Sequence, residues 1–239
     1  MERSIVDLYD INNDMSTQYD FAQINEEAEN ILGDILPMVL LMLSFAGCMG
    51  VSTEAVAGEK ERGTIATILT APINRRDVAM GKVIALGIIS FISVCISTIS
   101  VFVSLPSIMG TEYSVEQYDI NVYLGLLLLM LTTILFIVVI LVNISSLCNS
   151  TKEAHTAAIP FMILVLLLGM STMFNNACEL ENYMFLIPIY NTANSIKLLL
   201  TEGMTIQCFI TMISNLAYTF VGVRILGKLL EKEKIIFSA

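Results

Sequence analysis

The 239-residue chain contains no tryptophan, a single histidine and few charged side chains. Charged residues make up 14% of the sequence, whereas a soluble domain usually has about 25%. The net charge of −10 argues against a nucleic-acid partner, because proteins that bind nucleic acid are basic. The five cysteines are scattered and form no CxxC pair, so the sequence predicts neither a metal site nor a disulfide framework. A signal peptide is not predicted either, since Met1 precedes acidic and polar residues.

Long uncharged windows, in contrast, are abundant. The chain is 56% hydrophobic with a mean hydropathy of +0.77, and a membrane-spanning helix needs roughly 20 apolar residues. Five windows meet or approach this length: 35–53, 83–111, 120–151, 156–178 and 203–223. We trim the second near Leu105, before Pro106, and start the third near Tyr123. Because lipid forces each segment to satisfy its own backbone hydrogen bonds, the windows predict an all-α polytopic membrane protein with about five transmembrane helices. A soluble all-α core is the alternative, which five windows of this length disfavour.

The basic residues are distributed unevenly between the connections. Ten of the twelve lie in alternate connections, within 54–82, at Lys152 and within 224–234. The opposite connections hold only Arg3 and Lys197, together with most of the acidic residues. Since cytoplasmic loops carry the excess of lysine and arginine, the pattern predicts a multi-pass protein of the cell membrane. Its N-terminus would lie outside and its C-terminus in the cytoplasm.

This topology divides the chain into an acidic extracellular tail (1–33), a transmembrane domain (34–226) and a cytoplasmic tail (227–239). The acidic tail would have to cross the membrane without a preceding span or signal. Two explanations are open: either the first span inserts tail-first, or a natural N-terminal helix is missing here. We favour the second explanation.

The uncharged window 182–196 is too short for a span and is interrupted by Pro188. It follows the fourth span, so it is placed on the outer side of the membrane. We predict an outer segment over 182–201 made of two short helices that enter the outer leaflet or lie on it, because irregular backbone there must be shielded by protein or water. An ordinary extracellular loop is the alternative.

Several uncharged polar residues in or near the spans are candidates for a translocation pathway: Asn143, Ser146, Asn191 and Asn194. No charged residue lies deep in any predicted span, which weakens an ion-pump or proton-relay mechanism within this chain. Small residues such as Gly47, Gly50 and Gly81 let helices pack closely in lipid. They would do so either within the chain or at a subunit interface.

The window 58–82, GEKERGTIATILTAPINRRDVAMGK, concentrates five of the twelve basic residues between two apolar runs. Placing its eight charges in hydrocarbon would cost about 24 kcal/mol at roughly 3 kcal/mol each, so it lies outside the membrane core. Ile65, Ile68 and Leu69 form a narrow apolar stripe at helical spacing. Pro72 then ends that helix, and Asn74 with Asp77 suits the N-terminus of the next. The window therefore predicts a helix, a break and a capped helix.

An amphipathic helix outside the membrane core can lie on the membrane surface or bind another protein. Surface helices usually present a wide apolar face with large anchoring residues, whereas this stripe is narrow and its charges are mixed in sign. Protein docking is therefore the favoured interpretation. The cluster Glu59-Lys60-Glu61-Arg62 supplies directional ion pairs, each worth about 0–1 kcal/mol at an exposed rim.

The stretch EKERGTIATILTAPINRRDVAMGK resembles the cytoplasmic loop of ABC-2 type transporter permeases, in particular the sodium-efflux-type branch. NSTKEAHTAAIP at 149–160, IPIYNTANSIKLLLTEG and the C-terminal KLLEKEKIIF resemble further parts of that branch. The resemblance implies a bacterial plasma-membrane permease with six spans and a large extracellular domain, of which this chain lacks the first span and most of that domain. It also implies a homodimer or heterodimer of permeases bound to ABC ATP-binding subunits.

The same resemblance implies that the coupling helix Glu59–Thr70, within a coupling loop at 57–80, sits in a groove of the ATP-binding subunit. The implied contact residues are Glu59, Lys60, Glu61, Arg62, Gly63, Thr64, Ile65, Ile68 and Leu69. Mg-ATP would bind the partner subunit, and this chain would carry no cofactor of its own.

No enzyme is predicted in this chain. Gly222–Lys228 matches the spacing GxxxxGK, but Leu229 stands where a phosphate-binding loop needs serine or threonine, and no strand precedes it. His155 has no neighbouring ligand and is expected to be a solvated loop residue. No nucleophile–base pair is evident.

These observations favour the permease subunit of an ABC exporter, with sodium or another ion, a drug, a peptide or a lipid-like compound as cargo. A non-transporting membrane sensor or immunity protein that binds a ligand at its extracellular face is the alternative. A secondary transporter is disfavoured, because intramembrane charges and visible inverted repeats are absent from the sequence.

Overall fold

The structure is a computed structural model of the whole chain. It describes residues 21–64, 74–109, 119–174, 177 and 180–237. Side chains are described over 33–64, 74, 77–104, 119–174, 177 and 180–231.

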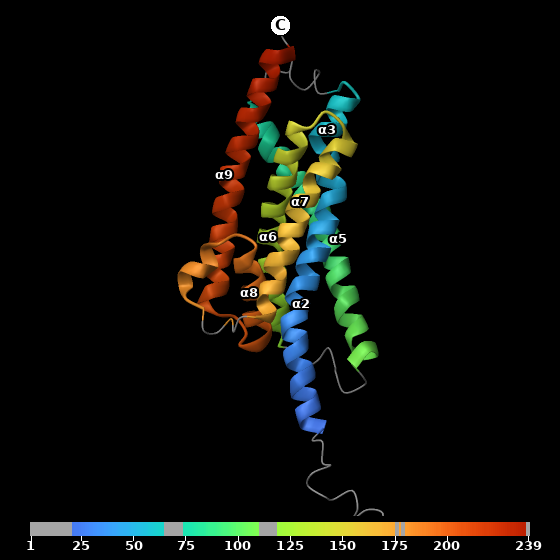
Figure 1. The fold of residues 1–239 in the computed structure, drawn as a ribbon. Helices are drawn as coiled ribbons and strands as arrows, with labels where there is room; N and C mark the ends of the chain where they lie inside the picture. Colours follow the sequence, from blue (N-terminus) through green and yellow to red (C-terminus); the bar gives the residue numbers. More distant parts are fainter. Residues whose placement is uncertain (1–20, 65–73, 110–118, 175–176, 178–179, 238–239) are drawn as a thin grey trace, which may run out of the picture.

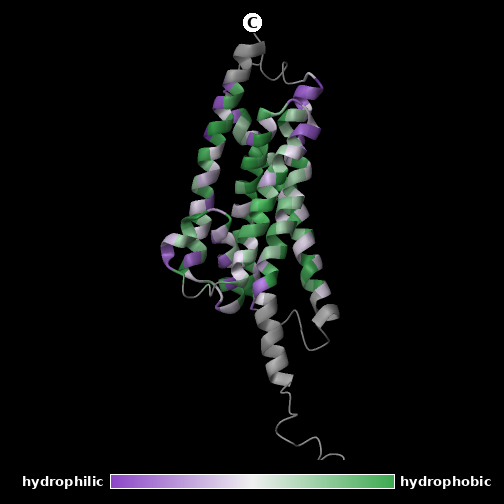
Figure 2. Ribbon diagram, viewed as in Figure 1, coloured by the Kyte–Doolittle hydropathy of each residue, from purple (hydrophilic) through white to green (hydrophobic). Residues whose placement is uncertain are grey.

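Long helices account for most of the described residues (Figure 1). They are α2 (Phe21–Ser52), α5 (Arg75–Met109), α6 (Ile120–Leu147), α7 (Thr151–Met170) and α9 (Ile206–Phe237). Each contains a stretch long and apolar enough to cross a membrane, giving five candidate spans in the described part of the chain. Figure 2 shows hydrophobic residues along the middle of the bundle and hydrophilic residues gathered toward its two ends. The predicted all-α polytopic fold is confirmed.

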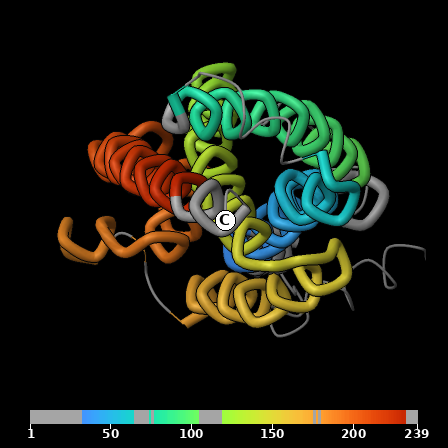
Figure 3. The backbone as a smooth tube through the Cα atoms, turned by 90° about the horizontal axis from the view of Figure 1, so that it is seen from above, coloured from blue at the N-terminus to red at the C-terminus, as the bar shows by residue number. Residues whose placement is uncertain are grey.

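Helix α6 is the centre of the bundle, with the other long helices around it (Figure 3). It contacts α2, α5, α7, α8 and α9. In its most apolar window 72% of the residues are buried by protein, against 22–44% in the other four spans. The outer helices instead expose large apolar side chains such as Ile88, Ile96 and Ile213, as expected for faces that contact lipid.

The long helices alternate in direction, so the connections gather at two ends of the bundle (Figure 1). The α3 end holds α3 (Glu54–Glu61), the start of α5, the α6–α7 connection and the last turns of α9. The α8 end holds α8 (Tyr190–Thr201) and the short 3₁₀ helices η2 (Ser171–Met173) and η4 (Asn182–Leu186). The segments predicted to share the cytoplasmic side therefore do meet at one end.

Three helix boundaries differ from those expected. Helix α2 begins at Phe21, so residues 21–33 of the predicted tail are helical, because extending an existing helix costs far less than starting one. Helix α5 passes through Pro106 and ends at Met109. A proline lacks the N–H that would bond to the carbonyl four residues earlier, so α5 continues past Pro106 without that one hydrogen bond. Helix α6 starts at Ile120 rather than near Tyr123.

The predicted coupling helix Glu59–Thr70 is helical at residues 59–61 but wrong at residues 62–64. Helix α3 ends at Glu61, and residues 62–64 form a turn. Gly63 takes φ +72°, a conformation that costs glycine little and is typical of the residue just after a helix. The sequence carried this signal, a lysine in the last turn followed by glycine. Residues 65–73, with Ile65, Ile68, Leu69 and Pro72, lie outside the described residues.

Two short helices occupy the predicted outer segment, η4 and α8, separated at Pro188. Ile189, which precedes α8, has φ 71° and ψ −50°, close to the rare and strained γ-turn geometry. Helix α8 contacts α2, α6 and α9, and most of its side chains are buried. The segment is thus packed against the bundle; its depth in a bilayer stays a prediction.

Glycines mark the closest helix contacts, but largely not those singled out from the sequence. A Cβ on Gly47 would lie 3.3 Å from Val94, whereas at Gly50 and Gly81 it would meet nothing within 4 Å in this chain. An added Cβ would lie 2.9 Å from the β-branched Val139 side chain at Gly222 and 2.7 Å from Leu135 at Gly87. The residue that opens the GxxxxGK match therefore lets α9 pack on α6.

Candidate functional site

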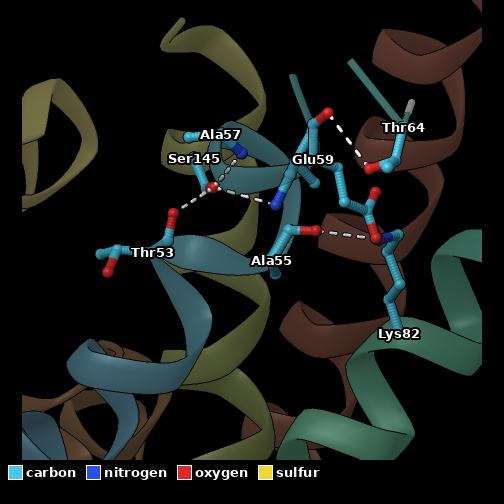
Figure 4. Close-up of polar contacts among 8 residues, drawn as sticks. Thr53, Ala55, Ala57, Glu59, Thr64, Lys82 and Ser145 are labelled. Carbon is cyan, nitrogen blue, oxygen red and sulfur yellow. Dashed lines mark hydrogen bonds and ion pairs between the residues drawn. The ribbon is translucent and has the colours of Figure 1, made fainter. Parts of the chain in front are cut away.

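The α3 end is organised around a break between α2 and α3 at Thr53 (Figure 4). Ser145 of α6 fills this break. Its hydroxyl accepts hydrogen bonds from the N–H groups of Val56 at 3.2 Å and Ala57 at 3.0 Å, and donates to the carbonyl of Thr53 at 2.6 Å. The first four N–H groups of a helix have no partner within it. The buried Ser145 hydroxyl accepts from two of those of α3, at Val56 and Ala57. Ser145 thereby joins α3 to the central helix.

Lys82 joins α3 to α5 (Figure 4). Its ammonium group donates to the carbonyl of Ala55 at 2.8 Å and to the Glu59 carboxylate at 2.5 Å. The two charged side chains are 17% and 28% exposed. A partly buried pair is screened by salt less than a fully exposed one, so this contact holds the start of α5 against α3.

Two further charged residues join α3 to the α6–α7 connection. Lys60 donates to the carbonyl of Ser146 at 2.5 Å. The Glu61 carboxylate accepts from both the N–H and the hydroxyl of Thr151, each at 3.0 Å. Thr151 is the first residue of α7, where a carboxylate is favoured by the unpaired N–H groups and the helix dipole.

Beyond α3, the chain is turned toward solvent. Arg62, Gly63 and Thr64 are exposed, and Thr64 donates to the carbonyl of Glu59 at 3.3 Å. Asn74 precedes α5, as predicted, and its carbonyl accepts from the N–H of Asp77 at 3.1 Å in the first turn. The two ends of the predicted coupling loop are therefore fixed close to the same helices.

His155 is not the solvated loop residue that was expected. It lies in α7, is half-buried, and its Nε2 is 3.1 Å from the hydroxyl of Thr53. Nearby, burial raises the pKa of the Cys148 thiol, and the Glu153 carboxylate raises that pKa further while Lys60 lowers it. Both residues belong to the same junction at the α3 end.

At the α8 end, a network of buried uncharged side chains joins α6, α8 and α9. Asn191 donates to Ser214 at 2.8 Å and to Asn215 at 3.1 Å. Asn215 in turn donates to Thr133 at 3.2 Å and Thr192 at 3.1 Å. All five are fully or almost fully buried. Asn215, Thr133 and Thr192 were not predicted from the sequence. The pair Asn191 and Asn215, 24 residues apart in two consecutive helices, could have indicated a contact.

The four candidate pathway residues lie in two separate places. Asn143 donates to the carbonyls of Val139 and Gly222, while the Ser146 hydroxyl donates to the carbonyl of Asn143. Asn191 and Asn194 belong to α8, at the opposite end of the bundle. The carbonyl oxygens of the Asn143 and Asn194 side chains are buried without a partner among the described residues. A continuous polar path through these four residues stays a prediction.

One ion pair lies at the α8 end. Lys197 of α8 contacts Asp34 of α2 and donates to the carbonyl of Thr172 at 2.8 Å. The Thr172 hydroxyl also donates to the Asp34 carbonyl at 2.8 Å. Lys197, counted as one of two outer basic residues in the sequence, therefore fixes α8 to the first span.

Five candidate spans with α6 at their centre, and an organised junction where their polar connections meet, define a multi-pass membrane protein. The chain belongs to the ABC-2 family of transporter proteins, whose family model matches residues 5–226. Members of this family are transmembrane components and not the ATPase itself. The expectation that arose from the loop sequence is thus confirmed at the level of the family.

The chain is also similar to a curated relative, the ABC transporter permease protein NatB of Bacillus subtilis (strain 168), with 29% identity over 177 residues. The matched region covers 71% of this chain and 45% of the relative. The chain therefore spans less than half the length of that relative. No solved structure matches the chain.

Proposed function

We propose that the chain is the membrane-spanning subunit of an ABC exporter that works with a separate ATP-binding subunit. The observation that carries the proposal is the junction at the α3 end. In a chain of this family, α3, α5, α6 and α7 meet there through named contacts, directly beside the exposed turn at 62–64. Such a junction gives a docked subunit a rigid attachment to four helices.

The α3 end faces the cytoplasm in this proposal. Ten of the twelve basic residues belong to connections that meet at this end, and an excess of lysine and arginine is typical of cytoplasmic loops. Two permease chains, identical or different, would complete the transporter with two ATP-binding subunits and bound Mg-ATP. ATP would be hydrolysed only in those subunits.

The cargo is proposed at the level of chemical class. The resemblance to the sodium-efflux-type branch supports an ion such as sodium, while a drug, a peptide or a lipid-like compound fits the same architecture. Export would proceed by alternating access as ATP binding draws the ATP-binding subunits together. The experiment is ATP-driven flux in vesicles that contain the chain with its ATP-binding subunit, with and without sodium.

Subunit docking is tested by co-purification of an ABC ATP-binding subunit co-expressed with the full chain. Arg62→Glu should abolish binding, because it reverses the charge of an exposed residue at the docking turn. Glu202→Lys, an equal charge reversal at the exposed end of α8, is the matched control and should leave binding unchanged. Binding that survives Arg62→Glu, or labelling of a cysteine at position 62 from outside the cell, would contradict the proposal. Ligand binding at the extracellular face without ATP-driven flux would favour the sensor or immunity protein instead.

A further inference from the structure

The charged residues at the end of α3 form a distinct group within the predicted docking segment. Glu59, Lys60 and Glu61 each reach a partner in a different element of the chain. Glu59 pairs with Lys82 of α5, Lys60 with the Ser146 carbonyl of α6, and Glu61 with Thr151 of α7. Three consecutive side chains thus contact three different helices; Glu59 and Lys60 are half-buried, and Glu61 makes its contact at the surface.

The next residues behave differently. Arg62, Gly63 and Thr64 are exposed, and Gly63 at φ +72° turns the chain away from the α3 axis. Among the described residues, the Arg62 side chain has no hydrogen bond or ion pair, although its charge lies near Glu61. Among the described residues of this segment, Glu61 is therefore the last one whose side chain contacts another helix.

The contact between Glu61 and Thr151 has a particular consequence. It is made to both the backbone N–H and the hydroxyl of the first residue of α7. It therefore joins the connection after the first span to the connection after the third. The Ser145 bridge and the Lys82 pair join the same short helix to α6 and α5.

We propose that Glu59, Lys60 and Glu61 are positioning residues and do not themselves contact the ATP-binding subunit. They hold α3 against α5, α6 and α7, so that a displacement of the docking turn moves these helices together. The proposal rests on the proposed function and deepens it, because it separates residues that bind the subunit from residues that transmit its movement. Arg62, Gly63 and Thr64 bind the subunit, and Glu59 to Glu61 transmit its movement.

The first test compares Glu61→Gln and Thr151→Val with Arg62→Glu in the full chain. Co-purification of the ATP-binding subunit measures binding, and the ATPase activity that the chain stimulates in that subunit measures coupling. For the two positioning variants we expect binding to stay within about twofold while stimulated activity falls by about 2- to 30-fold, the range known for residues that modulate coupling. Thr151→Ser keeps both donors and should restore wild-type activity. Arg62→Glu should lose binding itself.

The second test fixes the contact covalently. In a variant without its native cysteines, E61C and T151C are joined with a short bifunctional methanethiosulfonate reagent. If α3 and α7 move together, the joined protein keeps at least about half of its stimulated ATPase activity. A covalent link between two elements that move as one unit blocks no motion between them. The same pair, E61C with T151C, labelled with a monofunctional methanethiosulfonate reagent that leaves the two cysteines unjoined, controls for modification of these positions.

The outcomes separate the two proposals. Failure of the wild-type chain to bind any ATP-binding subunit overturns the proposed function, whereas the cross-link in the isolated chain still tests the contact. Loss of binding in Glu61→Gln to the same degree as in Arg62→Glu overturns the positioning role. Unchanged stimulation in Glu61→Gln, failure of the cross-link to form, or inactivation by the cross-link overturns it as well.

Discussion

At the α3 end, helices are joined mainly by charged side chains at a half-exposed surface, whereas at the α8 end they are joined mainly by buried amides and hydroxyls. Lys82 and Glu59 are 17% and 28% exposed, while Asn191 and Asn215 are 0% exposed. Water can replace a lost partner at the first site but not at the second. Losing a single contact should therefore cost less at the α3 end than in the α8 network, where the unpaired group would stay buried.

The largest effect is expected from Asn215→Leu at the α8 end. The substitution removes three hydrogen bonds, to Asn191, Thr133 and Thr192, while each of these partners keeps another bond in the network. At about 1 kcal/mol for each bond, the free energy of unfolding should fall by about 3 kcal/mol. Thermal unfolding in detergent measures the loss, which should be equal at low and high salt. A salt-dependent loss would contradict a network of neutral groups.

Gly222→Ala tests the core that both ends share. The new methyl group would meet the stiff Val139 side chain at 2.9 Å, and overpacking typically costs about 1–3 kcal/mol. Gly50→Ala is the matched control, because its methyl group would meet nothing within 4 Å and alanine favours the helix by about 1 kcal/mol. Thermal unfolding should separate the two variants in opposite directions; equal effects would refute close packing at Gly222.

Ser145→Ala should have a smaller and local effect at the α3 end. It leaves the N–H groups of Val56 and Ala57 without their acceptor, at about 1–2 kcal/mol. Hydrogen exchange of these two amides should accelerate, while exchange at the α8 end stays the same. Ser146→Ala is the control, because that hydroxyl bonds only within its own helix. Unaltered hydrogen exchange in Ser145→Ala would show that the Ser145 hydroxyl does not bond to these two amides.

The Lys82–Glu59 pair should contribute about 0.5 kcal/mol, as expected for a partly exposed ion pair. A double-mutant cycle with Glu59→Gln and Lys82→Met measures this interaction free energy at low salt. The value should decrease at high salt, since screening weakens charges near the surface. An interaction free energy that is independent of salt would show that the Lys82–Glu59 pair is shielded from solvent, as the α8 network is.

The smallest effect concerns reactivity and not stability. Burial and the Glu153 carboxylate raise the pKa of the Cys148 thiol, so less thiolate is present at a given pH than for an exposed cysteine. Labelling by iodoacetamide in detergent should therefore begin at a higher pH than for a cysteine introduced at exposed Arg62. Equal pH profiles for the two cysteines would show that Cys148 is not buried at the junction.

The spans were predictable from the sequence because each depends only on its own composition. Hydropathy and the absence of charge locate the spans, and the distribution of lysine and arginine groups their ends correctly. Where helices start and stop was less predictable. Helix α5 already starts at Arg75 and α9 continues to Phe237, beyond the uncharged windows 83–111 and 203–223. Pro106 was expected to end the second span, yet α5 continues to Met109 without the one hydrogen bond that a proline cannot donate.

The partners of individual side chains were not predictable. Glu59, Lys60 and Glu61 were assigned to docking from a local pattern, yet their contacts with Lys82, Ser146 and Thr151 span 23 to 90 positions. A local pattern carries no information about which distant helix lies opposite. The role of Ser145 was missed for the same reason. The sequence does not show that this serine lies beside the break at Thr53, 92 positions away.

The backbone is strained at Ile189, the residue that precedes α8. A branched residue at φ 71° holds a backbone conformation that costs about 1–3 kcal/mol, and that cost is met only while α8 remains seated in its network. If the hydrogen bonds from α8 to its neighbouring helices were broken, the backbone at Ile189 could relax and this strain would be relieved. The strain at Ile189 therefore lowers the free energy needed to release α8 from the bundle by about 1–3 kcal/mol.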